Sequence, residues 1–364
     1  HTYCPAGWII NAQFPARPMR PGVASDARKT QERLPVAKRS QFREFMSTST
    51  IDRPAISAAL MVSSLFLLGF QDSLVKLINA ETSLWQLMMF RALFNFALFI
   101  LLARLIWGGA RPKAVRPGAV ALRTAFHVTA MSFFFGGIPF LSLAELAAGL
   151  YVFPLFVAVL SALVLKERVG PRRIAAIAVG FCGTLLILKP GTDAFTPIGL
   201  MPVCAGFCYA CAILTTRKLC REESPVTLAF AISAGFFIVG CVGIIANSVL
   251  PGGEMAVSWP YLFTGWHPAT WGLVGFFALI SCVNVVAMVN LGKAYQSAES
   301  SWLAPFDYSY LIFATFWGFV FWQHVPDVLT FVGMAMIASA GSFVAWRERR
   351  EKLRIAATQS GGAG

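Results

Sequence analysis

Ten long apolar segments dominate the sequence and leave few folds open to the chain. Each is about 20 residues long, which as a helix matches the roughly 30 Å hydrocarbon core of a bilayer. The strands of a membrane barrel would be about half as long and would alternate in polarity. We therefore predict an all-α polytopic membrane protein with ten transmembrane helices. The predicted spans are 56–78, 84–106, 119–138, 144–165, 173–189, 197–217, 226–249, 269–291, 299–322 and 329–346.

The charged residues predict the orientation of these spans. Only 13% of the residues are charged, against about a quarter in soluble proteins, yet the net charge is +13. Of the 30 Lys and Arg, 18 border the even-numbered connections or follow the last span, whereas Lys189 alone lies in an odd-numbered connection. The positive-inside rule then predicts an inner-membrane protein with both termini cytoplasmic. The basic charge therefore indicates orientation, and we expect no nucleic-acid partner.

The two ends of the chain differ from the apolar middle. Residues 1–55 are basic, rich in Pro and Arg and without hydrophobic periodicity, so we predict a disordered segment. We expect the native start at Met46; the alternative is a genuine tail that contacts anionic headgroups. Residues 347–364 form a basic tail after the last span.

The eight cysteines lie mostly within the predicted spans. Cys204, Cys208 and Cys211 share one face of the span 197–217, and the last two form a CxxC motif. A metal or redox site there would need further ligands, and none stand nearby in the sequence. We therefore predict that these thiols are packing residues, with no metal and no cofactor.

The ten spans divide into two sets of five, residues 56–191 and 192–346. The segments "LSALVLKERVGPRRIAAIAVGFCGTLLI" and "TFWGFVFWQHVPDVLTFVGMAMIASAG" share a layout: an apolar span, a polar turn, and a span rich in small residues. Because each half has an odd number of spans, the halves would run in opposite directions. Inverted repeats are typical of secondary transporters, whose binding site lies near the membrane midplane.

A shared pattern of residues recurs within 144–191 and 303–350: Pro154, Leu163 to Arg168 with Glu167, Ala304 to Tyr308, Gly318, Val325 to Asp327, and Gly333. With these residues, the two segments resemble the two EamA-type repeats of the drug/metabolite transporter superfamily. The resemblance implies ten helices in two inverted halves, no ATP-binding domain and the transport of small organic metabolites. It is greatest to the branch that includes S-adenosylmethionine uptake carriers. The chain departs from the pattern at Gln323 and His324, where a carboxylate often ends the ninth span.

Asp307 is the polar residue that most needs an explanation. A bare carboxylate at the bilayer centre costs about 2.5–3.5 kcal/mol. Pro305 is expected to bend or open the helix beside it, as Pro154 does in the fourth span. Together with the hydroxyls of Tyr308 and Tyr310, the carboxylate could bind a substrate ammonium or sulfonium, or take up a proton. The alternative is a structural ion pair with Lys76 or Arg91.

Other polar residues within the spans are further candidates for substrate binding or coupling. Asp72 and Lys76 are four residues apart, which also allows a self-neutralising pair. Arg91 either snorkels to the interface or receives an anionic substrate group. Glu145 either faces a cavity between helices or is an interfacial carboxylate. The remaining candidate is Asn284 in the eighth span.

The loop 251–268 carries Trp259, Tyr261, Trp266 and His267. Aromatic residues between two spans commonly sit at the level of the lipid headgroups. We therefore predict that they are belt residues.

These observations predict a secondary active transporter of a small amino-acid-like or S-adenosylmethionine-like metabolite. It would work by alternating access, with proton coupling through Asp307 or Glu145 as a hypothesis. The alternatives are an exporter of the same fold and, less favoured, a channel or sensor. An intramembrane enzyme is disfavoured, because the chain has no GxSxG string and no paired Tyr-Asp and Gly-Asp motifs. The expected partners are the substrate and the bilayer; a monomer and a homodimer both remain open.

Overall fold

The computed structural model describes residues 54–106, 114–165, 171–189, 196–250, 253–298 and 300–361. The predicted N-terminal segment with Met46, and also Glu167, lie outside the described residues. Every regular element in the described ranges is a helix, as predicted. The helices are α3 (Pro54–Leu77), α4 (Leu84–Ile106), α5 (Pro117–Gly136), α6 (Leu143–Leu150), α7 (Phe153–Leu165), α8 (Pro171–Leu188), η1 (Pro197–Gly199), α9 (Leu200–Leu219), α10 (Pro225–Val249), α11 (Gly253–Ser258), α12 (Pro260–Phe263), α13 (Trp271–Ser297), α14 (Ser300–Asp307), α15 (Ser309–Trp322) and α16 (Val328–Gly361).

Seven stretches of the described chain are long and apolar enough to cross a membrane. Two shorter apolar helical stretches, Ile174–Leu188 and Val328–Val344, match the fifth and tenth predicted spans. The ninth predicted span is divided between α14 and α15. The prediction of a polytopic all-α membrane protein is confirmed. The seven long stretches are Ala55–Leu77, Leu84–Leu101, Pro117–Gly136, Leu143–Val164, Pro197–Leu219, Val226–Val249 and Trp271–Tyr295.

Local sequence signals set many of the helix starts. Proline is the first residue of α3, α5, α8, α10 and α12. Proline suits this position because its missing N–H would have no partner in the first turn. Ser142, Ser224 and Thr270 cap α6, α10 and α13, and each side chain accepts a hydrogen bond from a backbone N–H three residues on.

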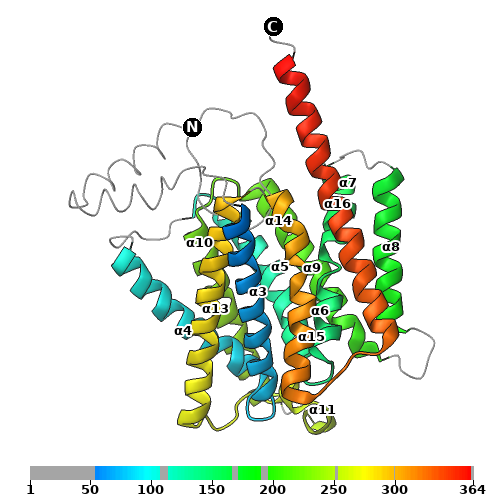
Figure 1. Cartoon of the computed structure of the whole chain (residues 1–364). Coiled ribbons are helices and arrows are strands. Elements are labelled where there is room, and N and C mark those ends of the chain that lie inside the picture. Colours follow the sequence, from blue (N-terminus) through cyan, green and yellow to red (C-terminus); the bar gives the residue numbers. More distant parts are fainter. Residues whose placement is uncertain are drawn as a thin grey trace.

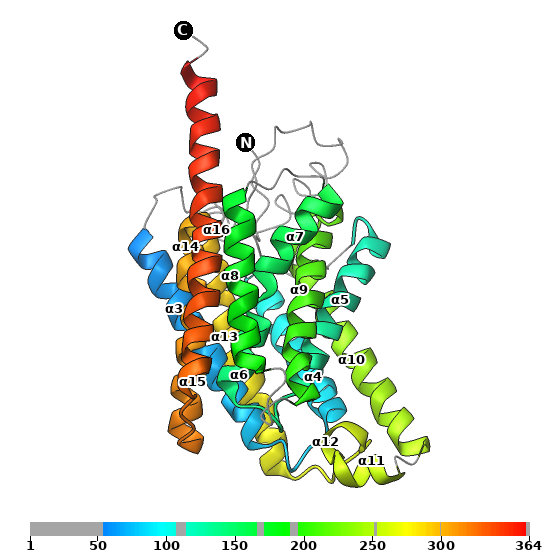
Figure 2. The same cartoon turned by 90° about the vertical axis from the view of Figure 1, so that its right-hand side faces the viewer.

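The helices lie side by side in one bundle (Figure 1). α3 packs against α13 and α15, α5 against α9, α4 against α10, and α8 along α16. α11 and α12 cover one end of the bundle, which we call the α11 end (Figure 2). α16 projects beyond the other helices at the opposite end, which we call the C-terminal end.

α8 and α16 cross with their backbones in contact at two glycines. A Cβ on Gly183 would stand 2.7 Å from the carbonyl oxygen of Gly333, and a Cβ on Gly333 would stand 2.6 Å from that of Gly183. Small residues allow such an approach between membrane helices. The crossing is therefore reciprocal and leaves no room for a side chain on either helix.

Candidate functional site

Two interrupted helices face one another near the middle of the bundle. α6 ends at Leu150 and α7 begins at Phe153, so Tyr151 and Val152 lie in the interruption. Pro154 explains this break. In a continuous helix its ring would clash with the carbonyl of Leu150, and proline has no N–H that could donate a hydrogen bond to that carbonyl. α6 packs against α15, and the ring of Tyr151 stacks on Tyr310 at 5.2 Å.

The second interruption, between α14 and α15, consists of Tyr308 alone. Pro305 remains inside α14, and Tyr308 keeps helical dihedral angles, with φ −69° and ψ −8°. The helix therefore loosens three residues after the proline instead of opening at it. Backbone of this kind is tolerated at membrane depth where it is buried in protein or lines a wet cavity.

Asp307 is the last residue of α14 and lies between these interruptions. Its carboxylate accepts a hydrogen bond from the Tyr151 hydroxyl at 3.5 Å. The hydroxyls of Tyr209, Tyr295 and Tyr308 also lie within electrostatic range of the carboxylate. The residue that bonds to Asp307 is thus Tyr151. The alternative prediction, a structural ion pair of Asp307 with Lys76 or Arg91, named different partners.

A chain of hydrogen bonds continues from the tyrosines into α3. Tyr310 donates to Asp72 Oδ2 at 2.5 Å, and Gln71 Nε2 donates to Asp72 Oδ1 at 3.0 Å. Asn284 of α13 donates to Gln71 Oε1 at 2.8 Å. Asp72, Tyr310 and Asn284 were predicted site residues, and the structure brings them together through Gln71.

Arg91 of α4 joins the same network. Its Nη2 donates to Gln71 Oε1 at 3.3 Å, and its guanidinium lies 4.8 Å from the centre of the Phe135 ring. The residue is only 8% exposed. The snorkelling alternative is therefore wrong, because Gln71 and Phe135 hold the side chain inside the bundle.

Lys76 and Glu145 lie apart from this network, toward the α11 end. Lys76 Nζ donates to the carbonyl oxygen of Leu141 at 2.5 Å and stands 5.5 Å from the centre of the Trp322 ring. The predicted Asp72–Lys76 pair is not formed, because Lys76 is one turn further along α3 and reaches the loop before α6 instead.

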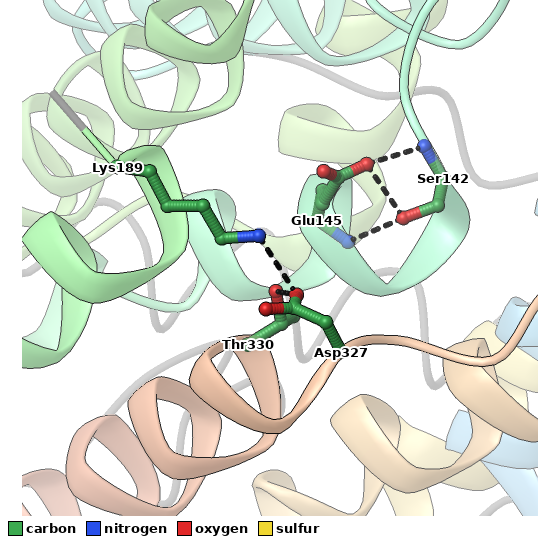
Figure 3. A network of polar contacts seen from close by, with 5 residues as sticks. All are labelled: Ser142, Glu145, Lys189, Asp327 and Thr330. Atoms are coloured by element: carbon green, nitrogen blue, oxygen red, sulfur yellow. Dashed lines mark hydrogen bonds and ion pairs between the residues drawn. The ribbon is translucent and has the colours of Figure 1, made fainter. Parts of the chain in front are cut away.

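Glu145 is the third residue of α6 and completes a capping box. Its carboxylate accepts from the backbone N–H and the hydroxyl of Ser142 at 2.8 and 2.7 Å. In Figure 3 the carboxylate is turned toward Ser142. Glu145 also lines a small cavity between α6, α8 and α9, with Thr184 and Thr196 on its other walls. Glu145 thus caps α6 at the edge of this cavity, apart from the Asp307 network.

An ion pair joins α8 to α16 at the α11 end. Lys189 Nζ lies 2.9 Å from Asp327 Oδ1, and the Thr330 hydroxyl donates to the same oxygen at 2.5 Å (Figure 3). The Thr330 hydroxyl and the Lys189 ammonium lower the pKa of Asp327 to about 2. Because this pKa is below its unfolded value near 4, the contribution to stability is present above about pH 4 and is lost as the pH falls toward 2. The Asp327 side chain is 47% exposed, which limits this electrostatic contribution to a few tenths of a kcal/mol.

Asp327 directly precedes α16, and its carboxylate accepts hydrogen bonds from the backbone N–H of Leu329 and the hydroxyl of Thr330, so that it caps this helix. We expect Asp327→Ala to lower the free energy of unfolding by about 1 kcal/mol, because it removes this cap as well as the ion pair. Asp327→Asn keeps a capping side chain and should lose only a few tenths of a kcal/mol. Denaturant unfolding of the purified protein at pH 7 measures both. Equal losses in the two variants would show that the cap has no role.

The aromatic loop before α13 covers the α11 end and contacts protein. Tyr261 is only 3% exposed. Trp85 Nε1 donates to the carbonyl oxygen of Leu262 at 2.8 Å, and Gln86 forms hydrogen bonds of 2.7 and 2.9 Å with the backbone of His267. The belt prediction is therefore wrong for Tyr261, since polar groups of α4 hold the loop over the bundle.

The described cysteines all have free thiols. Cys204 is exposed, and Cys208 and Cys211 are partly buried. Within the described ranges, no three His, Cys, Asp or Glu side chains gather in a way that could hold a metal ion.

The sequence reasoning missed Gln71, Tyr151, Tyr209 and Tyr295. Each is an uncharged residue in an apolar span or, for Tyr295, just after one, so no local charge or motif distinguishes it. The sequence did offer one signal for Tyr151, because this tyrosine lies three residues before Pro154, the proline that interrupts the span.

Comparisons with known proteins agree with this architecture. Residues 55–189 match the EamA-like transporter family. A riboflavin transporter of Rhizobium johnstonii is 27% identical over 67% of this chain and 79% of its own length. An S-adenosylmethionine uptake transporter of Rickettsia prowazekii is 24% identical over 79% of this chain and 91% of its own length. A crystal structure that is 15% identical superposes with a TM-score of 0.51, over 80% of this chain and 98% of that one.

The matched relatives are transporters and not enzymes. Its helices, its interrupted spans and these matches all agree with the resemblance drawn from the sequence. The chain is a polytopic membrane protein whose residues 55–189 match the EamA-like transporter family.

Proposed function

We propose that the chain is a secondary active transporter that moves a small organic metabolite across an inner membrane by alternating access. The observation that carries the proposal is the position of Asp307, a carboxylate at the end of a half-helix and opposite a second interrupted helix. Interrupted helices form the substrate sites of many secondary transporters. Five of the chain's seven tyrosines lie near this carboxylate. A carboxylate among aromatic rings suits an organic ammonium or sulfonium.

The helix packing supports ten spans in two inverted repeats, residues 56–191 and 192–346. α3 packs against α13 as α9 packs against α5, and α3 contacts α14 and α15 as α9 contacts α6 and α7. α4 pairs with α10 and α8 with α16, so each of these helices meets its counterpart. This twofold relation would allow one half to rock against the other around the central site. The charge distribution supports cytoplasmic N- and C-termini.

Polar contacts join the two halves at both ends of the bundle. At the C-terminal end, the Glu223 carboxylate accepts backbone hydrogen bonds from Val115 and Arg116 at 3.1 and 2.6 Å. At the α11 end, Gln86 is bonded to His267. We propose that these contacts open alternately as the site becomes accessible from each side.

Asp307 is the stronger candidate for proton coupling. The other candidate, Glu145, already accepts two hydrogen bonds in the capping box of α6. Asp307, by contrast, accepts a single, long side-chain hydrogen bond from the described residues, that of Tyr151 at 3.5 Å, which leaves its carboxylate available to a substrate cation or a proton.

Two substrate classes follow from the relatives and the site. An S-adenosylmethionine-like metabolite would place its sulfonium at Asp307. A flavin is the second candidate, because the near-parallel rings of Tyr151 and Tyr310, at 13° to one another, form a surface on which a flat ring system could stack.

Counterflow in proteoliposomes tests the proposed function. Vesicles with the full-length chain are loaded with unlabelled S-adenosylmethionine or riboflavin, and entry of the labelled compound is followed. We expect saturable counterflow of one compound, accelerated by a pH gradient of one polarity. Vesicles without protein give the background.

Three outcomes would contradict parts of the proposal. Entry that never saturates would indicate a channel. Counterflow that ignores the pH on both sides would remove proton coupling. Saturable entry of neither compound would remove both substrate classes.

A further inference from the structure

Arg91 carries a buried positive charge that the protein leaves incompletely bonded. Its Nη2 is bonded to Gln71, but Nε and Nη1 have no hydrogen-bond partner among the described residues. Asp72 attracts Arg91 electrostatically, but the two carboxylate oxygens of Asp72 are already bonded to Gln71 and Tyr310. Unpaired charged groups are rare inside proteins, because burying them without partners is costly. The site therefore has two guanidinium donors to spare.

A second donor without a partner lies within electrostatic range of Arg91. The hydroxyl of Tyr261, on the short helix α12, has no hydrogen-bond partner in the described part of the chain, although the residue is only 3% exposed. The Phe135 ring lies against the guanidinium and restricts its orientation. A guanidinium and a hydroxyl without partners are the groups that proteins use to bind a carboxylate.

The hydrogen-bond chain connects this place to Asp307. It runs from Arg91 through Gln71, Asp72 and Tyr310, and the stacked Tyr151 then reaches Asp307. The central network thus has a cationic end at Arg91 and an anionic end at Asp307. A ligand that satisfies both ends must itself carry both charges.

We infer that Arg91 and Tyr261 form an anion subsite that receives the carboxylate of a dipolar substrate. The inference rests on the proposed function and narrows it to amino-acid-like metabolites that carry a carboxylate together with a cationic group. Because Tyr261 belongs to the covering loop, binding of the carboxylate would also hold the α11 end closed.

Matched ligand pairs test the subsite. Each pair differs only in the anionic group: S-adenosylmethionine and its decarboxylated form, methionine and methioninamide, and flavin mononucleotide and riboflavin. Thermal stabilisation of the purified full-length protein gives the affinity of each compound. We expect S-adenosylmethionine to bind at least tenfold more tightly than its decarboxylated form.

Tyr261→Phe is the decisive variant, because it removes a hydroxyl that has no partner within the described protein and should not disturb the fold. We expect it to weaken S-adenosylmethionine binding roughly tenfold, the effect of one hydrogen bond to a charged group, and to leave the decarboxylated form unchanged. Arg91→Gln should weaken it further, and Arg91→Lys should restore part of the loss. Tyr295→Phe is the control, because it removes a tyrosine hydroxyl within electrostatic range of Asp307 instead of Arg91. It should change the affinities for S-adenosylmethionine and for its decarboxylated form by the same factor.

Each result decides the inference. Equal affinities within every pair, or Tyr261→Phe and Arg91→Gln effects that are the same for both members, would overturn the subsite and leave the proposed transport function standing. Preferential binding of riboflavin over flavin mononucleotide, with no binding of S-adenosylmethionine, would also overturn the subsite and leave the transport function standing. It would favour a flavin substrate. Absence of binding by all six compounds would contradict both the subsite and the substrate classes proposed above.

Discussion

Asp307→Asn is expected to lower S-adenosylmethionine counterflow on the order of a hundredfold and to leave the protein folded. The amide has nearly the shape of the carboxylate, and its oxygen can still accept the hydrogen bond from Tyr151. It can neither attract a cationic group nor carry a proton as an acid does. Removing one partner of a buried charged pair costs about 2–5 kcal/mol, which is a loss in affinity of roughly thirtyfold or more.

The measurement is the initial rate of counterflow over a range of substrate concentrations, with the thermal midpoint recorded for the same preparations. The matched control is Asp327→Asn, the same change in a partly exposed residue at the α11 end, which should leave the rate nearly unchanged. If Asp307 were only a scaffold residue, its variant would lose thermal stability in proportion to its activity. A stable and fully active Asp307→Asn protein would contradict both roles.

The sequence predicted the helices better than the contacts between them. Apolar length alone located the spans, because every membrane helix must satisfy its own backbone hydrogen bonds. Charged residues such as Asp307 and Arg91 were identified because their cost in a bilayer makes them conspicuous. Gln71, which links Arg91, Asn284 and Asp72, lacks a charge and could not be distinguished from other polar residues of a span.

The predicted pairing of Asp72 with Lys76 failed for a related reason. Spacing along one helix shows which side chains share a face, but it does not show what the neighbouring helices offer. The hydroxyl of Tyr310, which is 238 residues from Asp72 in the sequence, donates a hydrogen bond to the Asp72 carboxylate. Lys76 instead donates to a backbone carbonyl in the loop before α6. Contacts of this range depend on the three-dimensional arrangement of the bundle. They therefore had to be observed.

The crossing of α8 and α16 gives the second large prediction. Gly333→Val is expected to lower the free energy of unfolding by about 3 kcal/mol, because its Cβ would stand 2.6 Å from the backbone oxygen of Gly183. A backbone oxygen cannot rotate away as a side chain does, so the helices must separate. Gly333→Ala should cost less, about 1–2 kcal/mol, since alanine favours the helix and offsets part of the clash.

Gly275→Ala is the matched control for this effect. Gly275 lies in α13 with nothing within 4 Å of its Cβ position, so the same substitution should be neutral or stabilise by up to about 1 kcal/mol. A loss of stability in Gly333→Ala without a loss in Gly275→Ala would separate the effect of the helix crossing from that of helix propensity. Denaturant unfolding in detergent measures both variants under one set of conditions.

The double variant Gly183→Ala, Gly333→Ala tests whether the two glycines act through one contact. Once the first methyl group has separated the helices, the second finds more room, so the double variant should cost less than the sum of the single ones. Costs that add fully would mean that each methyl group meets a separate obstacle, such as Met336 for Gly183 and Ile187 for Gly333. The reciprocal crossing would then not be the feature that holds α8 against α16.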